Sequence, residues 1–310
     1  MELIEPTNRA ATSLQTEQWG VAEAFAHCQR VARQHYENFP VASVLIPKSL
    51  RPHVAAIYAF SRAADDIADE GNFSVEERLR RLDEWEHHLD DACSGKPTGP
   101  IFTALAATIS QHSIPAQLLR DLLTAFRMDA RNGGYHTMDD LLFYCRHSAN
   151  PIGRLVLHLF GLATPERVQL ADMICTGLQL VNFWQDISVD LPGGRVNIPQ
   201  EIMQSFDCPP EQLRSGKFTP NCQRMMQHLT EHAEEFLREG SKLLPIIPHR
   251  RLRWELTLTV RGGLAIAQKI RQAGFNTLAA RPTLGIMDKV RLVVGRTRRE
   301  HKSRNYRPSP

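Results

Sequence analysis

The stretch IYAFSRAADDIADE, residues 57–70, combines the spacing of an apolar helix with three closely spaced aspartates. At about 100° per residue its polar members fall within roughly 60° on the helix surface: Tyr58, Arg62, Asp65 and Asp69. Alanine, isoleucine and phenylalanine cover most of the rest. A surface helix usually has a wide polar face instead. The pattern therefore predicts a helix surrounded by its neighbours, with a polar stripe that lines an internal cavity.

A second acidic stripe lies in GLQLVNFWQDISVDLPGGRV, residues 177–196. On one continuous helix its polar members would fall within roughly 80°: Gln179, Asn182, Asp186 and Asp190. A single acidic pair at this spacing is weak evidence, because such pairs occur by chance on solvated helices. Two stripes in apolar helices, about 120 residues apart, predict that four carboxylates and an amide converge on one cavity.

Carboxylate and amide oxygens are the ligands that Mg²⁺ prefers, with water and phosphate oxygens completing the shell. Di-iron bundles instead use Glu and Glu-x-x-His pairs, which neither stripe contains. A Mg²⁺ site between two aspartate helices predicts a diphosphate ligand, and Arg62 and Arg195 could add counter-charge. The metal would stabilise negative charge on a departing diphosphate.

A diphosphate that leaves by ionisation creates a carbocation, which requires an apolar, water-poor pocket with aromatic faces. The aromatic residues near the stripes are Tyr36, Phe39, Tyr58, Phe60, Phe143, Tyr144, Phe183 and Trp184. For any single phenylalanine, ordinary core packing is the more common outcome. Tyr58 is the stronger candidate because it shares the acidic face.

The whole chain has 310 residues, 42% hydrophobic and 23% charged, which is typical of a globular protein. Apolar residues recur at spacings of three and four almost throughout, and β-type alternation is scarce. We expect one all-α domain over residues 1–310, with flexible tails at 1–17 and 300–310. The expected helices are 18–36, 50–70, 75–93, 100–112, 115–131, 138–147, 150–161, 165–190, 220–243, 248–275 and 283–300.

Local signals refine this interpretation. SVEERL predicts a capping box between Ser74 and Glu77, and Thr164 and Thr219 are expected N-caps before proline. The six cysteines show no C-x-x-C pair or zinc spacing, so we interpret them as reduced core thiols of a cytoplasmic protein. No signal peptide and no membrane-spanning segment are expected.

Basic residues concentrate at the C-terminal end. Between Lys289 and Arg307 the net charge is +7, which leaves −4 for the rest of a chain whose total is +3. After the amphipathic MDKVRLVVG, this tail predicts peripheral contact with anionic lipid at the inner face of the membrane, although a solvated terminus is an equal alternative. We expect no nucleic-acid partner, because aromatic interleaving, zinc motifs and a recognition helix are missing.

These residues resemble the squalene/phytoene synthase family of all-α prenyltransferases. The resemblance rests on YAFSRAADDIAD (58–69), YCRHSANPIGRLVL (144–157) and LQLVNFWQDISVD (178–190). It extends from about residue 36 to 199, and more loosely through WELTLTVRGGLAIAQKI (254–270). It implies a single-domain helical bundle of the isoprenoid synthase type with a central cavity.

The resemblance also implies roles for individual residues. Asp65, Asp69, Asp186 and Asp190 would hold roughly two or three Mg²⁺ ions that bridge the diphosphate. Catalytic roles would fall to Tyr58, Arg62, Tyr144 and Asn182. The remaining candidates for binding the polyprenyl diphosphate substrate are Tyr36, Phe39, Phe60, Gln179, Phe183, Trp184, Gln185 and Arg195.

Within the family, ENFPVAS (37–43), SANPIGR (148–154) and NFWQD (182–186) look most like hydroxysqualene synthases of bacterial hopanoid biosynthesis. These are understood to ionise presqualene diphosphate and let water capture the cation, so no NADPH is expected. Presqualene diphosphate and phytoene synthases tend to carry N-I-L-R-D at the second motif, where this chain has Trp184 and Gln185. An arginine there could bind a second diphosphate. Asn197 also departs from the family, which commonly has tyrosine.

Two alternatives stay open. The first is the sibling reaction, in which two farnesyl diphosphates condense to presqualene diphosphate or, with NADPH, to squalene. The second is a non-catalytic bundle that binds an isoprenoid or assembles neighbouring pathway enzymes, but four intact acids argue against it. His35, His147 and His158 could each be proposed as a base, although a structural role is more common for each.

Overall fold

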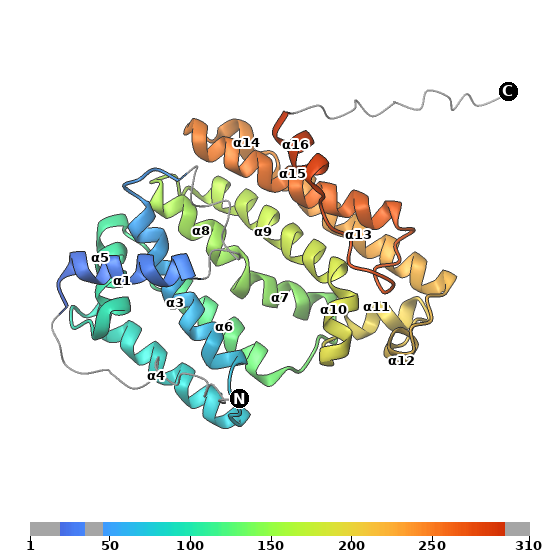
Figure 1. Cartoon of the computed structure of the whole chain (residues 1–310), viewed down its shortest axis with the longest axis horizontal. Helices are drawn as coiled ribbons and strands as arrows, with labels where there is room; N and C mark the ends of the chain where they lie inside the picture. The colour runs from blue at the N-terminus through green and yellow to red at the C-terminus, as the bar shows by residue number, and fades with distance from the viewer. Residues whose placement is uncertain (1–18, 35–45, 295–310) are drawn as a thin grey trace, which may run out of the picture.

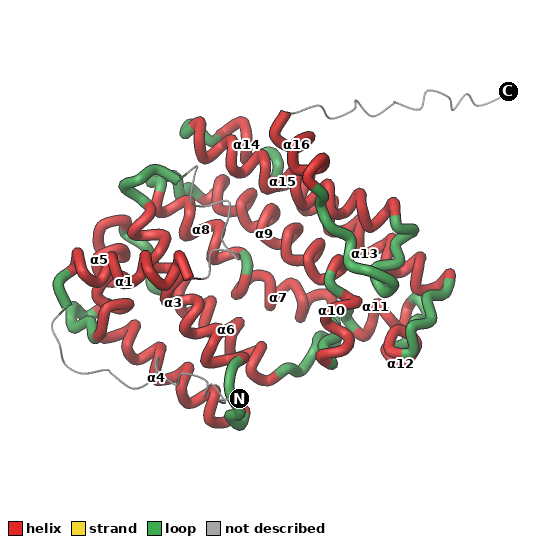
Figure 2. Tube along the Cα trace, in the orientation of Figure 1, coloured by secondary structure: helices red, strands yellow, loops and turns green. Residues whose placement is uncertain are grey.

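Helices make up the regular structure of this computed structural model, which describes residues 19–34 and 46–294 (Figures 1 and 2). No β-strand occurs in those ranges, which confirms the predicted all-α class. The helices, in chain order, are α1 (Val21–Gln34), α3 (Arg51–Asp69), α4 (Val75–Cys93), α5 (Gly99–His112), α6 (Gln117–Arg131), α7 (Met138–Ser148), α8 (Asn150–Leu159), α9 (Pro165–Gln185), α10 (Ile187–Asp190), the 3-10 helix η2 (Leu191–Gly193), α11 (Gln200–Ser205), α12 (Pro210–Arg214), α13 (Pro220–Gly240), α14 (Leu243–Ile246), α15 (Arg250–Gln272) and α16 (Ile286–Val294).

Helix α3, which carries the first acidic stripe, lies among α1, α4, α5 and α6. Phe60 is fully buried and stacks on Trp85 of α4, while Ala55, Ala56 and Ala59 belong to a cluster with α1. Neighbours therefore surround α3, as its composition predicts. Contacts then lead from α3 through α6 and α8 to α9, the helix of the second stripe.

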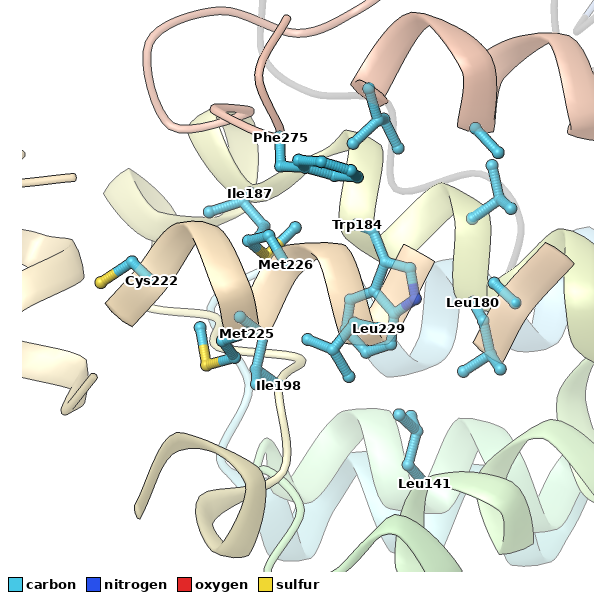
Figure 3. Packing of buried hydrophobic residues seen from close by; sticks show 14 of the residues in the cluster. Leu141, Leu180, Trp184, Ile187, Ile198, Cys222, Met225, Met226, Leu229 and Phe275 are labelled. Carbon is cyan, nitrogen blue, oxygen red and sulfur yellow. The ribbon is translucent and has the colours of Figure 1, made fainter. Parts of the chain in front are cut away.

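Helix α9 packs tightly against α13, and two glycines make this approach possible. A Cβ atom at Gly177 would lie 2.8 Å from Cγ of Leu237, and one at Gly240 would lie 2.7 Å from the backbone nitrogen of Ile174. Beyond these glycines, Trp184 is fully buried among Leu180, Met225 and neighbouring apolar residues (Figure 3). The second stripe is thus built on a rigid helix pair.

The predicted helix starts are mostly confirmed. Thr164 and Thr219 accept hydrogen bonds from backbone N–H groups three residues on, each before a proline. Ser74 also accepts from the N–H of Glu77. The Glu77 carboxylate, however, pairs with Arg80 and Arg81, so the described bonds complete only half of the capping box expected there.

Two expectations about helices were wrong. The segment 165–190, expected as one helix, is two, because the chain leaves helical geometry at Asp186 (φ −95°, ψ 7°). The stretch between residues 190 and 220, where no helix was expected, contains η2, α11 and α12. Proline contributes to the second error: Pro210 is the first residue of α12, a position where proline favours a helix start.

The interpretation of all six cysteines as reduced thiols was also wrong. Cys208 and Cys222 form a disulfide, with Cα atoms 5.4 Å apart. The bond ties the loop that contains α12 to the first turn of α13. Cys28 and Cys145 are buried thiols as expected, whereas Cys93 is exposed.

Within the described ranges, every helix is too short or too polar to span a lipid bilayer. The predicted tails at 1–17 and 300–310 lie outside those ranges. The assignment of the whole chain to a single domain stays a prediction.

Candidate active site

A cavity of about 510 Å³ opens beside the C-terminal end of α9. It is bounded by the end of α6, the segment 132–135, helices α7, α9 and α10, the loop 194–198, and parts of α11 and α12. All four polar members of the second acidic stripe line it: Gln179, Asn182, Asp186 and Asp190. The break at Asp186 therefore does not prevent the stripe from facing one space.

Asp190 has its own polar support in this cavity. The side-chain amide of Asn197 donates to Oδ2 of Asp190 at 2.9 Å. Burial and the charge of Asp186 raise the pKa of Asp190, while this hydrogen bond opposes the rise. The residue that departs from the family pattern is thus a direct partner of a predicted metal ligand.

The first stripe carries its own counter-charge, as predicted. Nη1 of Arg62 lies 3.2 Å from Asp65, and Nη2 lies 2.5 Å from Asp66 and 2.9 Å from Glu70. Burial raises the pKa of Asp65, and the charge of Arg62 opposes this rise. A bound cation would stabilise the charged form of such a partly desolvated carboxylate beside other acids.

Arg195 links the two stripes. Its Nη2 lies 3.1 and 3.2 Å from the two carboxylate oxygens of Asp69, across 126 residues of sequence. Arg195 also lines the cavity of the second stripe. The structure thus brings the end of α3 to the edge of that cavity.

Arg281 is a site residue that the sequence did not reveal. From the segment between α15 and α16, its Nε and Nη2 donate to the two oxygens of Asp186 at 2.5 and 3.2 Å. The adjacent Pro282 carbonyl accepts a 2.6 Å hydrogen bond from Gln185. No helical pattern marks Arg281 in the sequence, because it lies 95 residues from Asp186 in a non-helical segment.

Asp129 is the second residue that we missed. Tyr144 donates to its Oδ2 at 3.2 Å, and both residues line the cavity. Burial raises the pKa of Asp129 to about 6, and the Tyr144 hydrogen bond opposes the rise. The sequence did hold a signal: Asp129 follows the buried Leu122 and Ala125 at spacings of seven and four on α6.

The other predicted residues divide between cavity and core. Phe183 and Tyr144 line the cavity, with ring centroids 6.0 Å apart. Trp184 and Phe60 are instead fully buried in core clusters, and Gln185 is buried against Pro282. Tyr58 is half-buried on α3, where burial raises the pKa of its phenol. Tyr36 and Phe39 lie outside the described residues.

The carboxylates do not converge on one point as the sequence suggested. Among the described residues, no group of three Asp, Glu, His or Cys side chains could hold a metal ion. Arginines separate the acids: Arg62 binds Asp65, Arg195 binds Asp69 and Arg281 binds Asp186. Because Mg²⁺ commonly takes one or two protein carboxylates plus phosphate oxygens, the two acidic pairs fit Mg²⁺ with a diphosphate. Metal binding stays a prediction.

The chain is similar to known proteins in both sequence and fold. The squalene/phytoene synthase family model matches residues 32–290. A hydroxysqualene synthase of Sinorhizobium fredii is 34% identical over 241 residues, 77% of this chain and 80% of the relative. A chloroplastic phytoene synthase of Daucus carota is 29% identical over 71% of this chain and 56% of the relative. The crystal structure of the squalene synthase HpnC from Alicyclobacillus acidocaldarius superposes with a TM-score of 0.79 at 39% identity, covering 83% of this chain and 96% of that one.

Proposed function

The chain belongs to the squalene/phytoene synthase family of enzymes, and on that premise we propose that it converts presqualene diphosphate and water into hydroxysqualene and diphosphate. The observation that carries this choice is the similarity to hydroxysqualene synthase, 34% over 80% of the relative, against 29% over 56% for the carrot phytoene synthase. The reaction would serve squalene and hopanoid biosynthesis. It needs no hydride donor.

Two acidic pairs would hold Mg²⁺: Asp65 with Asp69, and Asp186 with Asp190. The bound metal would stabilise charge on the departing diphosphate. Arg62, Arg195 and Arg281 already contact three of these carboxylates. A bound diphosphate offers the arginines new anionic partners, so they can exchange carboxylate for phosphate oxygens without losing their charge-assisted hydrogen bonds.

Departure of the diphosphate takes the electron pair of the carbon–oxygen bond and leaves a carbocation. A water oxygen then bonds to the cation and must release one proton. The carboxylate of Asp129 is suited to accept it, because Asp129 lines the cavity, is not bound to an arginine in the described contacts, and has a pKa of about 6. Tyr144 would hold this carboxylate in place through its 3.2 Å hydrogen bond.

The second candidate is condensation of two farnesyl diphosphates, which the similarity to phytoene synthase favours. The sequence suggested that residue 185 acts by binding a second diphosphate directly, but the structure favours a different role. Gln185 is buried and holds the Pro282 carbonyl beside Arg281, so it would influence diphosphate binding through the Arg281 segment rather than by direct contact.

Product analysis distinguishes the two reactions. The purified protein is incubated with Mg²⁺ and presqualene diphosphate, and separately with farnesyl diphosphate, each with and without NADPH. We expect hydroxysqualene from presqualene diphosphate alone, unaffected by NADPH, and no product from Asp186→Asn. Conversion of farnesyl diphosphate to presqualene diphosphate or squalene would instead identify the condensing reaction.

A further inference from the structure

Helix α16 presents an apolar face to the outside. Ile286 is 81% exposed, Met287 66% and Val290 50%, and their spacing of one and four residues places them on the same side of the helix. Lys289 and Arg291 are exposed beside them. Contiguous exposed apolar side chains of this kind mark interaction surfaces rather than ordinary protein surface.

A groove at the start of α15 has the same character. Its lining includes Leu244, Pro245, Trp254, Arg250, Arg251 and Arg253, and its volume is about 720 Å³. Trp254 is 40% exposed. An exposed indole beside arginines and aliphatic side chains is typical of a protein surface that contacts a membrane interface.

Both features lie along α15. Lys269 of α15 pairs with Asp288 at 2.9 Å, and Arg261 donates to the carbonyl of Leu292 at 3.3 Å. Helix α16 therefore runs antiparallel to α15, and its C-terminal end is directed towards the start of α15 (Figure 1). Trp254 lies near that start, seven residues before Arg261 and on the same helix face. We call residues 244–254 and 286–291, taken together, the docking strip.

We propose that the docking strip binds the surface of an anionic lipid bilayer, with α16 lying in the plane of the interface. Charge complementarity selects this partner, because Arg250, Arg251, Arg253, Lys289 and Arg291 surround the apolar side chains. The acids in and beside the strip oppose this charge weakly: Asp288 is paired with Lys269, and burial raises the pKa of Glu255, directly after Trp254, to about 7. In sequence, six further basic residues follow between 296 and 307.

Vesicle sedimentation tests the proposal with the full chain and without substrate, so its outcome is independent of the proposed reaction. We expect the protein to sediment with vesicles of equal phosphatidylglycerol and phosphatidylcholine, to stay in solution with phosphatidylcholine alone, and to be released by salt. The variants Ile286→Glu/Met287→Glu/Val290→Glu and Arg250→Glu/Arg251→Glu/Arg253→Glu should each weaken binding at least tenfold.

A matched control separates this strip from net charge. Lys48, Lys96 and Lys217 are exposed elsewhere on the molecule, and their triple substitution by glutamate changes the charge as much as the arginine variant does. We expect the control to bind vesicles at least five times more tightly than the arginine variant. Equal loss in both variants, or full binding by the α16 variant with native circular dichroism, would overturn the proposal.

Trp254 gives a second, local readout. Brominated lipids quench only indoles that enter the bilayer interface, and the quenched signal should disappear in Trp254→Phe, which leaves Trp19, Trp85 and Trp184 in place. Quenching that persists in this variant would contradict the assignment. So would a dimer in lipid-free solution that the α16 variant dissociates, because the strip would then be an interface between two copies.

Discussion

Three influences compete at the carboxylate of Asp129. Burial raises its pKa, Tyr144 lowers it by donating a hydrogen bond, and the charges of Asp69, Arg195 and Asp65 act from the first stripe and its partner. The resulting pKa of about 6 lets a large fraction of Asp129 be ionised at neutral pH while keeping it basic enough to take a proton. Its proposed role as the proton acceptor can therefore be tested with single substitutions.

Asp129→Asn keeps the shape of the side chain and removes the proton acceptor. We expect the rate of hydroxysqualene formation to fall by roughly 10²- to 10⁴-fold, with little change in KM, because the base acts on the captured water and not on substrate binding. Assays of diphosphate release and hydroxysqualene in the same sample would show release exceeding alcohol formation. Asp121→Asn, on the same helix, is the control, and unchanged alcohol yield in Asp129→Asn would contradict the role.

Tyr144→Phe should move the pH dependence. Since the base must be ionised, activity is lost as the pH falls through the pKa of Asp129. Removal of the Tyr144 hydrogen bond destabilises the ionised form and raises that pKa, so the acidic limb of the kcat profile should shift to higher pH. The charges of Asp69, Arg195 and Asp65 also act on Asp129, and Tyr135 lines the same cavity; none of these residues changes in this variant. A shift to lower pH, or none, would contradict the assignment.

At single residues, sequence reasoning succeeded where a polar side chain interrupts an apolar helical pattern. Asp186 and Asp190 were found this way and line the cavity. Arg281 was not, because its partnership with Asp186 is created by tertiary folding of a loop. The Cys208–Cys222 disulfide was missed for the same reason, because the spacing of the two cysteines in the sequence does not predict that they pair.

At the level of elements, the helices were predictable because spacing and caps are local properties. Helices α3, α4 and α13 begin within one or two residues of their expected positions. The break between α9 and α10 was not predictable, because the apolar pattern continues through Ile187 and Val189 without glycine or proline. Which helices would meet also depended on glycines whose role appears only in the packed molecule.

The approach of α13 to α9 provides a test of that packing. Gly240→Ala would place Cβ 2.7 Å from the backbone nitrogen of Ile174 and 3.0 Å from the carbonyl of Leu170, atoms that cannot rotate away. We expect the free energy of unfolding to fall by about 1–3 kcal/mol in urea titrations. Gly262→Ala, with nothing within 4 Å of the added carbon, should instead be neutral or stabilising by roughly 0.5–1 kcal/mol. Equal effects would show that α9 and α13 are less closely packed than described.

At the scale of the whole molecule, Arg195 and Arg281 join parts of the chain that are distant in sequence. The first binds Asp69 of α3, and the second ties the segment before α16 to Asp186. A metal ion alone would have to displace these arginines from the carboxylates, whereas a metal with diphosphate supplies the arginines with new anionic partners. Ligand binding should thus be cooperative between Mg²⁺ and diphosphate.

Thermal unfolding should reveal this cooperativity without any catalytic turnover. Inorganic diphosphate with Mg²⁺ should raise Tm clearly more than the sum of the shifts given by each alone. At a ligand concentration of a hundred times Kd, binding would stabilise the protein by about 2.7 kcal/mol. Each kcal/mol would raise Tm by roughly 2–4 °C. Asp186→Asn should lose most of the combined shift, while Asp139→Asn, an exposed acid at the start of α7, should keep it. Additive shifts, or an undiminished shift in Asp186→Asn, would mean that the arginines do not change partners and that diphosphate binds elsewhere.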